Sequence, residues 1–116
     1  MLFDFGKYFY NKASSGKYSL NDCCRMAAYF VQDGYCYVTH RRLEIGEREL
    51  HHRLPRSLGG KDTPENLILL NRSVHRMVHS KNWQEYAEYA KNLNLTQEEL
   101  SLIGQLRFEA QSSFIS

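Results

Sequence analysis

The chain has 116 residues, of which 42% are hydrophobic and 24% are charged, and its formal net charge is +2. These values fit one ordinary globular domain and exclude a disordered chain. No apolar run approaches the roughly 20 residues of a membrane helix, and the N-terminus lacks the pattern of a secretory signal, so we expect a cytoplasmic protein.

The first third of the chain is predicted to contain an aromatic arm followed by one helix. Residues 1–18 combine Phe and Tyr with a polar, small-residue stretch, which indicates an arm and linker ahead of a single domain over 19–116. Apolar residues recur at helical spacing over about 19–32, and Gly34 suits a left-handed stop after that helix.

The three cysteines are not expected to form a disulfide. Their number is odd and they include no C-x-x-C pair, which argues against a disulfide framework and against a four-ligand structural zinc site. Packing is therefore the expected role of Cys23, Cys24 and Cys36.

Three short strands and one loop are predicted next. Residues 35–39 and 48–52 are typical of strands, and Pro55 limits how far the second strand can continue. Glycines, a proline and polar residues predict a loop over 56–64, and an apolar strand over 67–70 follows it.

Three helices are predicted after these strands. Asn71 or Ser73 can cap the first, which runs to about residue 80, and Asn82 can cap the second over about 83–92. The capping-box sequence that begins at Thr96 opens the last helix, whose final turns are expected to fray.

Four of the five histidines flank the predicted loop and the strand after it. His51 and His52 end a strand, while His75 and His79 lie four residues apart on a helix, close enough on one face to share one metal ion. The residue after His75 is Arg, which differs from the zinc-protease pattern, and no short-spaced cysteine pair precedes it as in a zinc finger. Alone, such a histidine pair also fits a surface or core role. Together with the His51-His52 doublet and Asn66, it forms an ordered pattern that indicates a functional site.

The stretch from Glu49 to His79 resembles the HNH endonucleases, which carry a ββα-metal finger and cut DNA with one divalent cation. Over roughly residues 35–107 the chain is similar to the endonuclease region at the C-terminus of group II intron reverse transcriptase/maturases. The resemblance implies an α+β fold with a ββα-metal (His-Me) finger over about 48–80 and further helices over 83–111. The chain departs from the intron family because Glu49 or Leu50 stands where another His is common.

The resemblance also implies a role for each residue of the pattern. His51, His75 and His79 match metal ligands, His52 matches the general base, and Asn66 matches the residue that fixes the loop and helps orient that base. Adjacent residues of a regular strand point to opposite faces, so the strand must end or twist at the doublet, and Asn66 can bond a loop carbonyl or the His52 ring to hold that bend.

The chemistry of these residue types agrees with those roles. Three imidazoles leave coordination positions open for phosphate and water, and a neutral imidazole can take a proton from water near neutral pH. Imidazole ligands favour tight binding of one Zn or Ni ion, with Mg or Mn as the alternatives for turnover.

The middle of the chain is basic, which is compatible with an anionic polymer on one face. We expect several of these side chains to contact phosphates without reading sequence. The candidates are Arg53, Arg56, Lys61, Arg72, Arg76 and Lys81.

The predicted function is therefore that of a metal-dependent endonuclease that hydrolyses DNA phosphodiester bonds, with an RNA or a larger ribonucleoprotein as a further partner in an intron-type system. The alternative is a non-catalytic HNH scaffold, such as an inhibitor or assembly factor, that binds nucleic acid or a protein. The small size of the chain and its unmatched aromatic N-terminus motivate this alternative.

Overall fold

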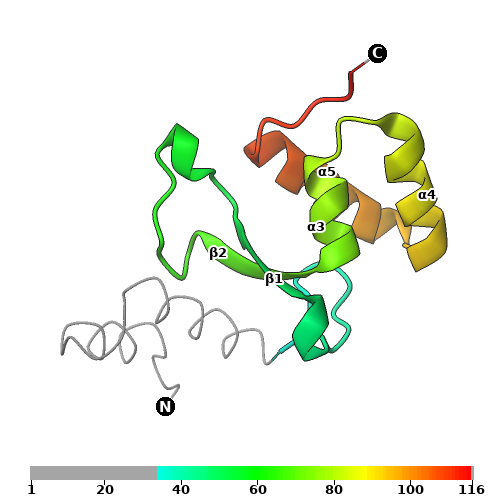
Figure 1. Ribbon diagram of the computed structural model, residues 1–116, viewed down its shortest axis with the longest axis horizontal. Helices are drawn as coiled ribbons and strands as arrows, with labels where there is room; N and C mark the ends of the chain where they lie inside the picture. Colours follow the sequence, from blue (N-terminus) through cyan, green and yellow to red (C-terminus); the bar gives the residue numbers. More distant parts are fainter. Residues whose placement is uncertain (1–33, 116) are drawn as a thin grey trace.

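The structure is a computed structural model that describes residues 34–115 (Figure 1). A two-stranded antiparallel sheet leads directly into three helices, and two short 3-10 turns flank the first strand. In chain order the elements are η1 (Ile45–Glu47), β1 (Arg48–His52), η2 (Arg56–Leu58), β2 (Leu67–Asn71), α3 (Arg72–His79), α4 (Trp83–Leu93) and α5 (Gln97–Glu109). This α+β arrangement, a β–β–α unit with further helices, is the one that the sequence predicts. The arm predicted over 1–18 and the helix predicted over 19–32, with Cys23 and Cys24, lie outside the described residues.

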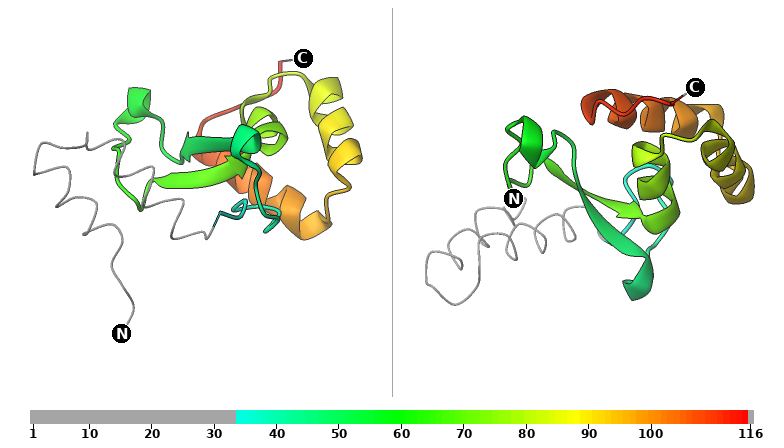
Figure 2. Two further views of the ribbon diagram at one scale, coloured as in Figure 1. Left: turned by 60° about the horizontal axis from the view of Figure 1, so that its bottom comes forward. Right: turned by 45° about the horizontal axis from the view of Figure 1, so that its top comes forward.

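The helix α3 occupies the middle of the arrangement. Figure 2 shows the sheet on one side of α3 and α4 on the other, and α3 also contacts α5. None of the helices in residues 34–115 is long and apolar enough to cross a membrane. The position of α3 matters because it brings residues of the β–β–α unit into contact with residues from the end of the chain.

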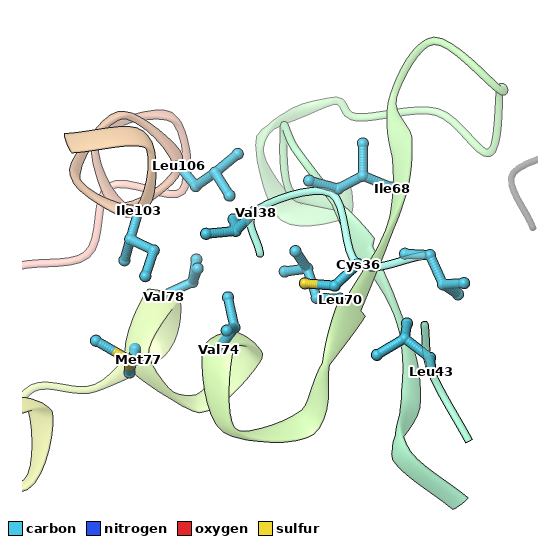
Figure 3. Packing of buried hydrophobic residues seen from close by; sticks show 11 residues of the cluster. Cys36, Val38, Leu43, Ile68, Leu70, Val74, Met77, Val78, Ile103 and Leu106 are labelled. Carbon is cyan, nitrogen blue, oxygen red and sulfur yellow. The ribbon is translucent and has the colours of Figure 1, made fainter. Parts of the chain in front are cut away.

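The hydrophobic core lies between β2, α3 and α5. Residues Leu67–Leu70 are all buried rather than alternating, because the sheet is covered on both of its faces at β2. Figure 3 shows side chains from β2, α3 and α5 meeting those of the turn that precedes β1. The labelled core residues are Cys36, Val38, Leu43, Ile68, Leu70, Val74, Met77, Val78, Ile103 and Leu106. Cys36 is buried with a free thiol, as its expected packing role requires.

The prediction of a strand over 35–39 is wrong. This segment forms a tight turn, in which the Cys36 amide donates to the Arg41 carbonyl and the His40 amide donates to the Cys36 carbonyl. Its remaining strand character is a single antiparallel bridge between Tyr35 and Arg42. Cys36 and Val38 are both buried, and that alternation imitates a strand in the sequence although the backbone turns back on itself.

The helix starts follow the predicted caps. The Asn71 side chain, rather than Ser73, accepts from the backbone of α3, and the Asn82 side chain accepts from the Glu85 amide at the start of α4. Thr96 and Glu99 form both hydrogen bonds of the capping box on α5. Local side-chain chemistry therefore sets these three helix starts.

Arg107 of α5 holds the C-terminal end of α3. Its side chain is buried at 6% exposure, and Nη1 donates to the carbonyls of Met77 and Ser80, each at 2.7 Å. The guanidinium also lies 4.0 Å from the ring centroid of Phe114. Carbonyls at a helix end have no partner within the helix, so this contact satisfies groups that would otherwise be buried unpaired.

Replacing Arg107 by Met should lower the free energy of unfolding by about 3 kcal/mol, because buried carbonyls lose a charged donor. Urea denaturation followed by circular dichroism measures this change. The control is Arg76→Met, which removes an exposed guanidinium that donates to the Tyr89 hydroxyl and should cost about 1 kcal/mol or less. Equal denaturation midpoints for the two variants would contradict the role of Arg107.

Candidate metal centre

Three imidazoles converge where β1 lies beside α3. His51 comes from β1, and His75 and His79 come from consecutive turns of α3. One ring nitrogen of each residue lies within 4.8 Å of the others, and the ring centroids are 4.8 to 5.1 Å apart. The structure thus brings together the three residues predicted as metal ligands.

The cluster opens toward solvent on one side. His51 is buried at 1% exposure, His75 is half-buried and His79 is exposed. A cation held by these rings would therefore have protein on the His51 side and open coordination positions on the other side. Such an open position distinguishes catalytic metal sites from closed structural ones.

The ring nitrogens fit a divalent cation. Nε2 of His51 is buried and has no hydrogen-bond partner among the described residues, while Nδ1 of His51 lies 3.3 Å from Nε2 of His79. A buried nitrogen without a partner is costly in a protein interior, and ligation through Nε2 would remove that cost. The donor set is all imidazole, which suits Zn or Ni better than an all-oxygen cation site.

Burial favours the neutral form of His51 and His79. Desolvation, followed by the neighbouring His75 and His79, lowers the pKa of His51 from 6.5 to about 3. Desolvation, followed by His75 and Arg107, also lowers the pKa of His79. Both rings therefore hold the uncharged form that metal ligation requires.

Glu49 supports the cluster from the same face of β1. Its Oε1 lies 2.9 Å from Nδ1 of His75, and its Oε2 lies 3.5 Å from Nε of Arg72. A carboxylate on one ring nitrogen fixes the imidazole so that the other nitrogen can face a cation. In the sequence, Glu49 stands out only as a departure from the intron family. The missed signal was the period of two along a strand, which puts Glu49 and His51 on one face.

His52 follows His51 but uses a different set of contacts. It is the last residue of β1, so the strand ends at the doublet as predicted. Its Nε2 lies 2.6 Å from Oδ1 of Asp62 in the loop, and that carboxylate also accepts hydrogen bonds from Arg56. Asp62 could not be identified from the sequence, because nothing in the local pattern indicates how the loop folds back onto His52.

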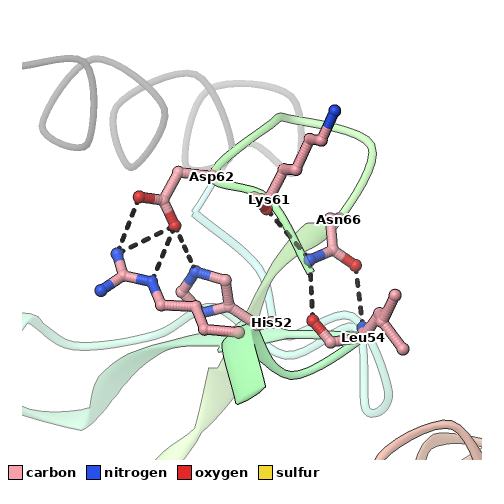
Figure 4. A network of polar contacts seen from close by, with 6 residues as sticks. His52, Leu54, Lys61, Asp62 and Asn66 are labelled. Carbon is pink, nitrogen blue, oxygen red and sulfur yellow. Dashed lines mark hydrogen bonds and ion pairs between the residues drawn. The ribbon is translucent and has the colours of Figure 1, made fainter. Parts of the chain in front are cut away.

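Asn66 holds the loop closed rather than touching His52. Its Oδ1 accepts from the Leu54 amide at 2.8 Å, and its Nδ2 donates to the carbonyls of Leu54 and Lys61, each at 3.0 Å (Figure 4). Of the two partners considered from the sequence, it therefore bonds the loop backbone. Gly60 is needed for the same closure, since a Cβ there would lie 1.7 Å from the Leu54 carbonyl oxygen.

The six basic candidates differ in their surroundings. Arg53 forms two hydrogen bonds with the Glu109 carboxylate, at 3.1 and 3.0 Å. The other arginines also have partners within the chain: Arg56 contacts Asp62, Arg72 donates to the Gly46 carbonyl, and Arg76 donates to the Tyr89 hydroxyl. Lys61 and Lys81 are exposed. Arg56, Arg72 and Arg76 are exposed as well, so all the predicted phosphate contacts except Arg53 lie on the surface.

Comparison with known proteins shows what this region is similar to. Residues 35–81 match the family model described as HNH endonuclease, and this segment contains all three clustered imidazoles, His52 and Asn66. Over 68 residues the chain is 35% identical to the type IV methyl-directed restriction enzyme EcoKMcrA of Escherichia coli (strain K12). That alignment covers 58% of this chain and 21% of the enzyme, so the chain spans about a fifth of its relative. No solved structure matches the chain significantly.

These matches confirm the resemblance to HNH endonucleases that the sequence analysis identified. The ββα-metal fold expected from that resemblance agrees with the observed β1–β2–α3 unit. The closer likeness to the group II intron region stays a prediction.

The pKa of His51 leads to a stability prediction for the metal-free protein. Between pH 6.5 and 5 the unfolded chain binds a proton at His51, whereas the folded protein does not until about pH 3. Stability should therefore fall as the pH drops through this window, with a slope of up to about 1.4 kcal/mol per pH unit from this one group. Urea titrations with EDTA present at several pH values measure the slope. His51→Phe should flatten it, and an unchanged slope in that variant would contradict the assignment.

Proposed function

We propose that this HNH-containing chain is a metal-dependent endonuclease that hydrolyses DNA phosphodiester bonds. The observation that carries the proposal is the convergence of His51, His75 and His79, with His52 next to His51 in the chain. The match of residues 35–81 to HNH endonucleases supports it. The chain spans only about a fifth of its restriction-enzyme relative, so methyl direction is not carried over to it.

In this proposal His51, His75 and His79 hold one divalent cation. When bound, the cation supplies positive charge that stabilises the phosphate in the transition state. The all-imidazole donor set favours Zn or Ni for tight binding, and Mg or Mn are the alternatives for turnover. Glu49 fixes the His75 ring in the orientation that ligation needs.

His52 acts as the general base. Its Nε2 is engaged with Asp62, so Nδ1 is the ring nitrogen that takes the proton from the attacking water. A general base at this step contributes about 10²–10⁴-fold to the rate. Asn66 keeps the loop closed around this residue through its three backbone hydrogen bonds.

DNA would dock through its phosphates, without sequence reading by this chain. The exposed Lys61 and Lys81 would contact phosphates directly, and the arginines would add contacts where a phosphate takes the place of their partner within the chain. An RNA or ribonucleoprotein partner has only the likeness to intron-encoded maturases in its favour. The non-catalytic scaffold is the competing proposal, and the complete set of site residues argues against it.

His52→Ala should reduce nicking of supercoiled plasmid by at least about 100-fold, because the water loses its proton acceptor. The variant should still bind Ni²⁺ and DNA, measured by calorimetry and filter binding. His75→Ala should instead lose Ni²⁺ binding, because one ligand of three is removed. His40→Asn, in the exposed turn outside the site, is the control and should keep both properties.

Two results would count against this assignment. Wild-type cutting rates in His52→Ala would show that the base is another group. A wild-type protein that binds DNA but does not cut with Mg²⁺, Mn²⁺, Ni²⁺ or Zn²⁺ would favour the scaffold.

Lys61→Ala and Lys81→Ala should each weaken binding to all DNA sequences alike. Each variant should lower the slope of log affinity against log salt concentration by about 1, because one phosphate contact is lost. Binding isotherms at a series of salt concentrations measure this slope. Lys91→Ala, on exposed α4, is the matched control and should leave the slope unchanged. A wild-type slope in both test variants would place the DNA elsewhere.

A further inference from the structure

We propose that Asp62 is the positioning residue of the site, which orients the His52 ring and keeps its proton on Nε2. This inference rests on the proposed function, in which His52 is the base. The family pattern of histidines and Asn66 does not include Asp62, and only the folded loop brings it to His52.

The contact between the two side chains has the geometry of a charge-assisted hydrogen bond. Nε2 of His52 and Oδ1 of Asp62 are 2.6 Å apart, and their side chains are 21% and 27% exposed. An ionised carboxylate can only accept, so the proton in this hydrogen bond belongs to Nε2. A neutral imidazole carries one proton, and its lone pair then lies on Nδ1.

Arg56 keeps the carboxylate ionised and in place. Its Nε and Nη2 donate to Oδ1 of Asp62 at 3.0 and 2.9 Å, and Nη2 also donates to Oδ2 at 2.8 Å. The hydrogen bond from His52, and next the one from Arg56, hold the pKa of the Asp62 carboxyl below its usual range. Both oxygens are therefore tied down, which limits rotation of the carboxylate away from His52.

The loop backbone places Asp62 independently of these side chains. Asn66 donates to the carbonyl of Lys61, the residue directly before Asp62, and to the carbonyl of Leu54, two residues after His52 (Figure 4). One amide thus sets the separation between the base and its carboxylate. Through this connection Asn66 orients the base without touching it.

The test compares Asp62→Ala with Glu65→Ala, which removes the other acid of the same loop segment and is exposed. In metal-free, ¹⁵N-histidine-labelled protein, we expect a protected Nε2–H proton signal from His52, assigned by its loss in His52→Ala. The signal should persist in Glu65→Ala and disappear in Asp62→Ala. Persistence in Asp62→Ala would overturn the proposal.

Kinetics supply the second readout. With Ni²⁺ or Mg²⁺ present, Asp62→Ala should lower kcat for plasmid nicking by about 10-fold or more, short of the loss caused by removing the base, with KM unchanged. Adding Asp62→Ala to His52→Ala should cause no further loss, because Asp62 acts through His52. A further loss in the double variant, or a loss of Ni²⁺ binding in Asp62→Ala, would show a merely structural role and overturn the proposal.

Failure of the two proposals can be told apart. If the wild-type protein fails to cut plasmid with every metal tested, the endonuclease function is overturned. The Nε2–H signal would still decide whether Asp62 orients His52. Normal cutting by Asp62→Ala would overturn the role of Asp62 and leave the endonuclease function standing.

Discussion

The site depends on how α3 packs against the sheet. Val74 and Val78 are fully buried on α3, one helical turn apart, and they dock the helix onto the core. His75 and His79 each follow one of these valines, so they lie on the adjacent stripe of the same helix. Once the valines are buried, the two imidazoles must point along the edge of the core, where His51 emerges from β1. The hydrophobic effect thus positions polar groups that have no strong attraction for one another.

Two carboxylates serve two imidazoles through separate networks. Glu49 contacts His75 beside the three-imidazole cluster, whereas Asp62 contacts His52 within the loop. The alternation of side chains along β1 keeps the networks apart, because His51 and His52 leave the strand in different directions. In the proposed function, the contacts of the metal ligands and those of the base can therefore be changed separately, although His51 and His52 are neighbours in the chain.

The parts of the structure that could be predicted are those that local chemistry determines. Helix starts at Asn71, Asn82 and Thr96 depend on side chains that bond backbone two or three residues away. Asn82 and Thr96 were predicted as caps, and Asn71 was one of the two caps predicted for α3. The pairing of the two histidines on α3 follows from helical periodicity alone. Residues 35–39 were predicted as a strand but form a turn, because the alternation of apolar residues does not reveal the backbone hydrogen bonds to Arg41 and Leu69. Contacts that close a loop or join distant segments, such as Arg53 with Glu109, were likewise out of reach, since sequence spacing does not encode them.

The contact of Arg107 with the end of α3 joins the region of HNH similarity to a residue well beyond it. The HNH match ends at residue 81, yet the donor that satisfies the last carbonyls of its helix comes from residue 107. A fragment that ends at residue 81 would contain every histidine. It would still lack Arg107, whose hydrogen bonds stabilise the last turn of α3, where His79 lies. The region of sequence similarity therefore contains the histidines of the candidate site, while the folded unit that supports them extends through α4 and α5.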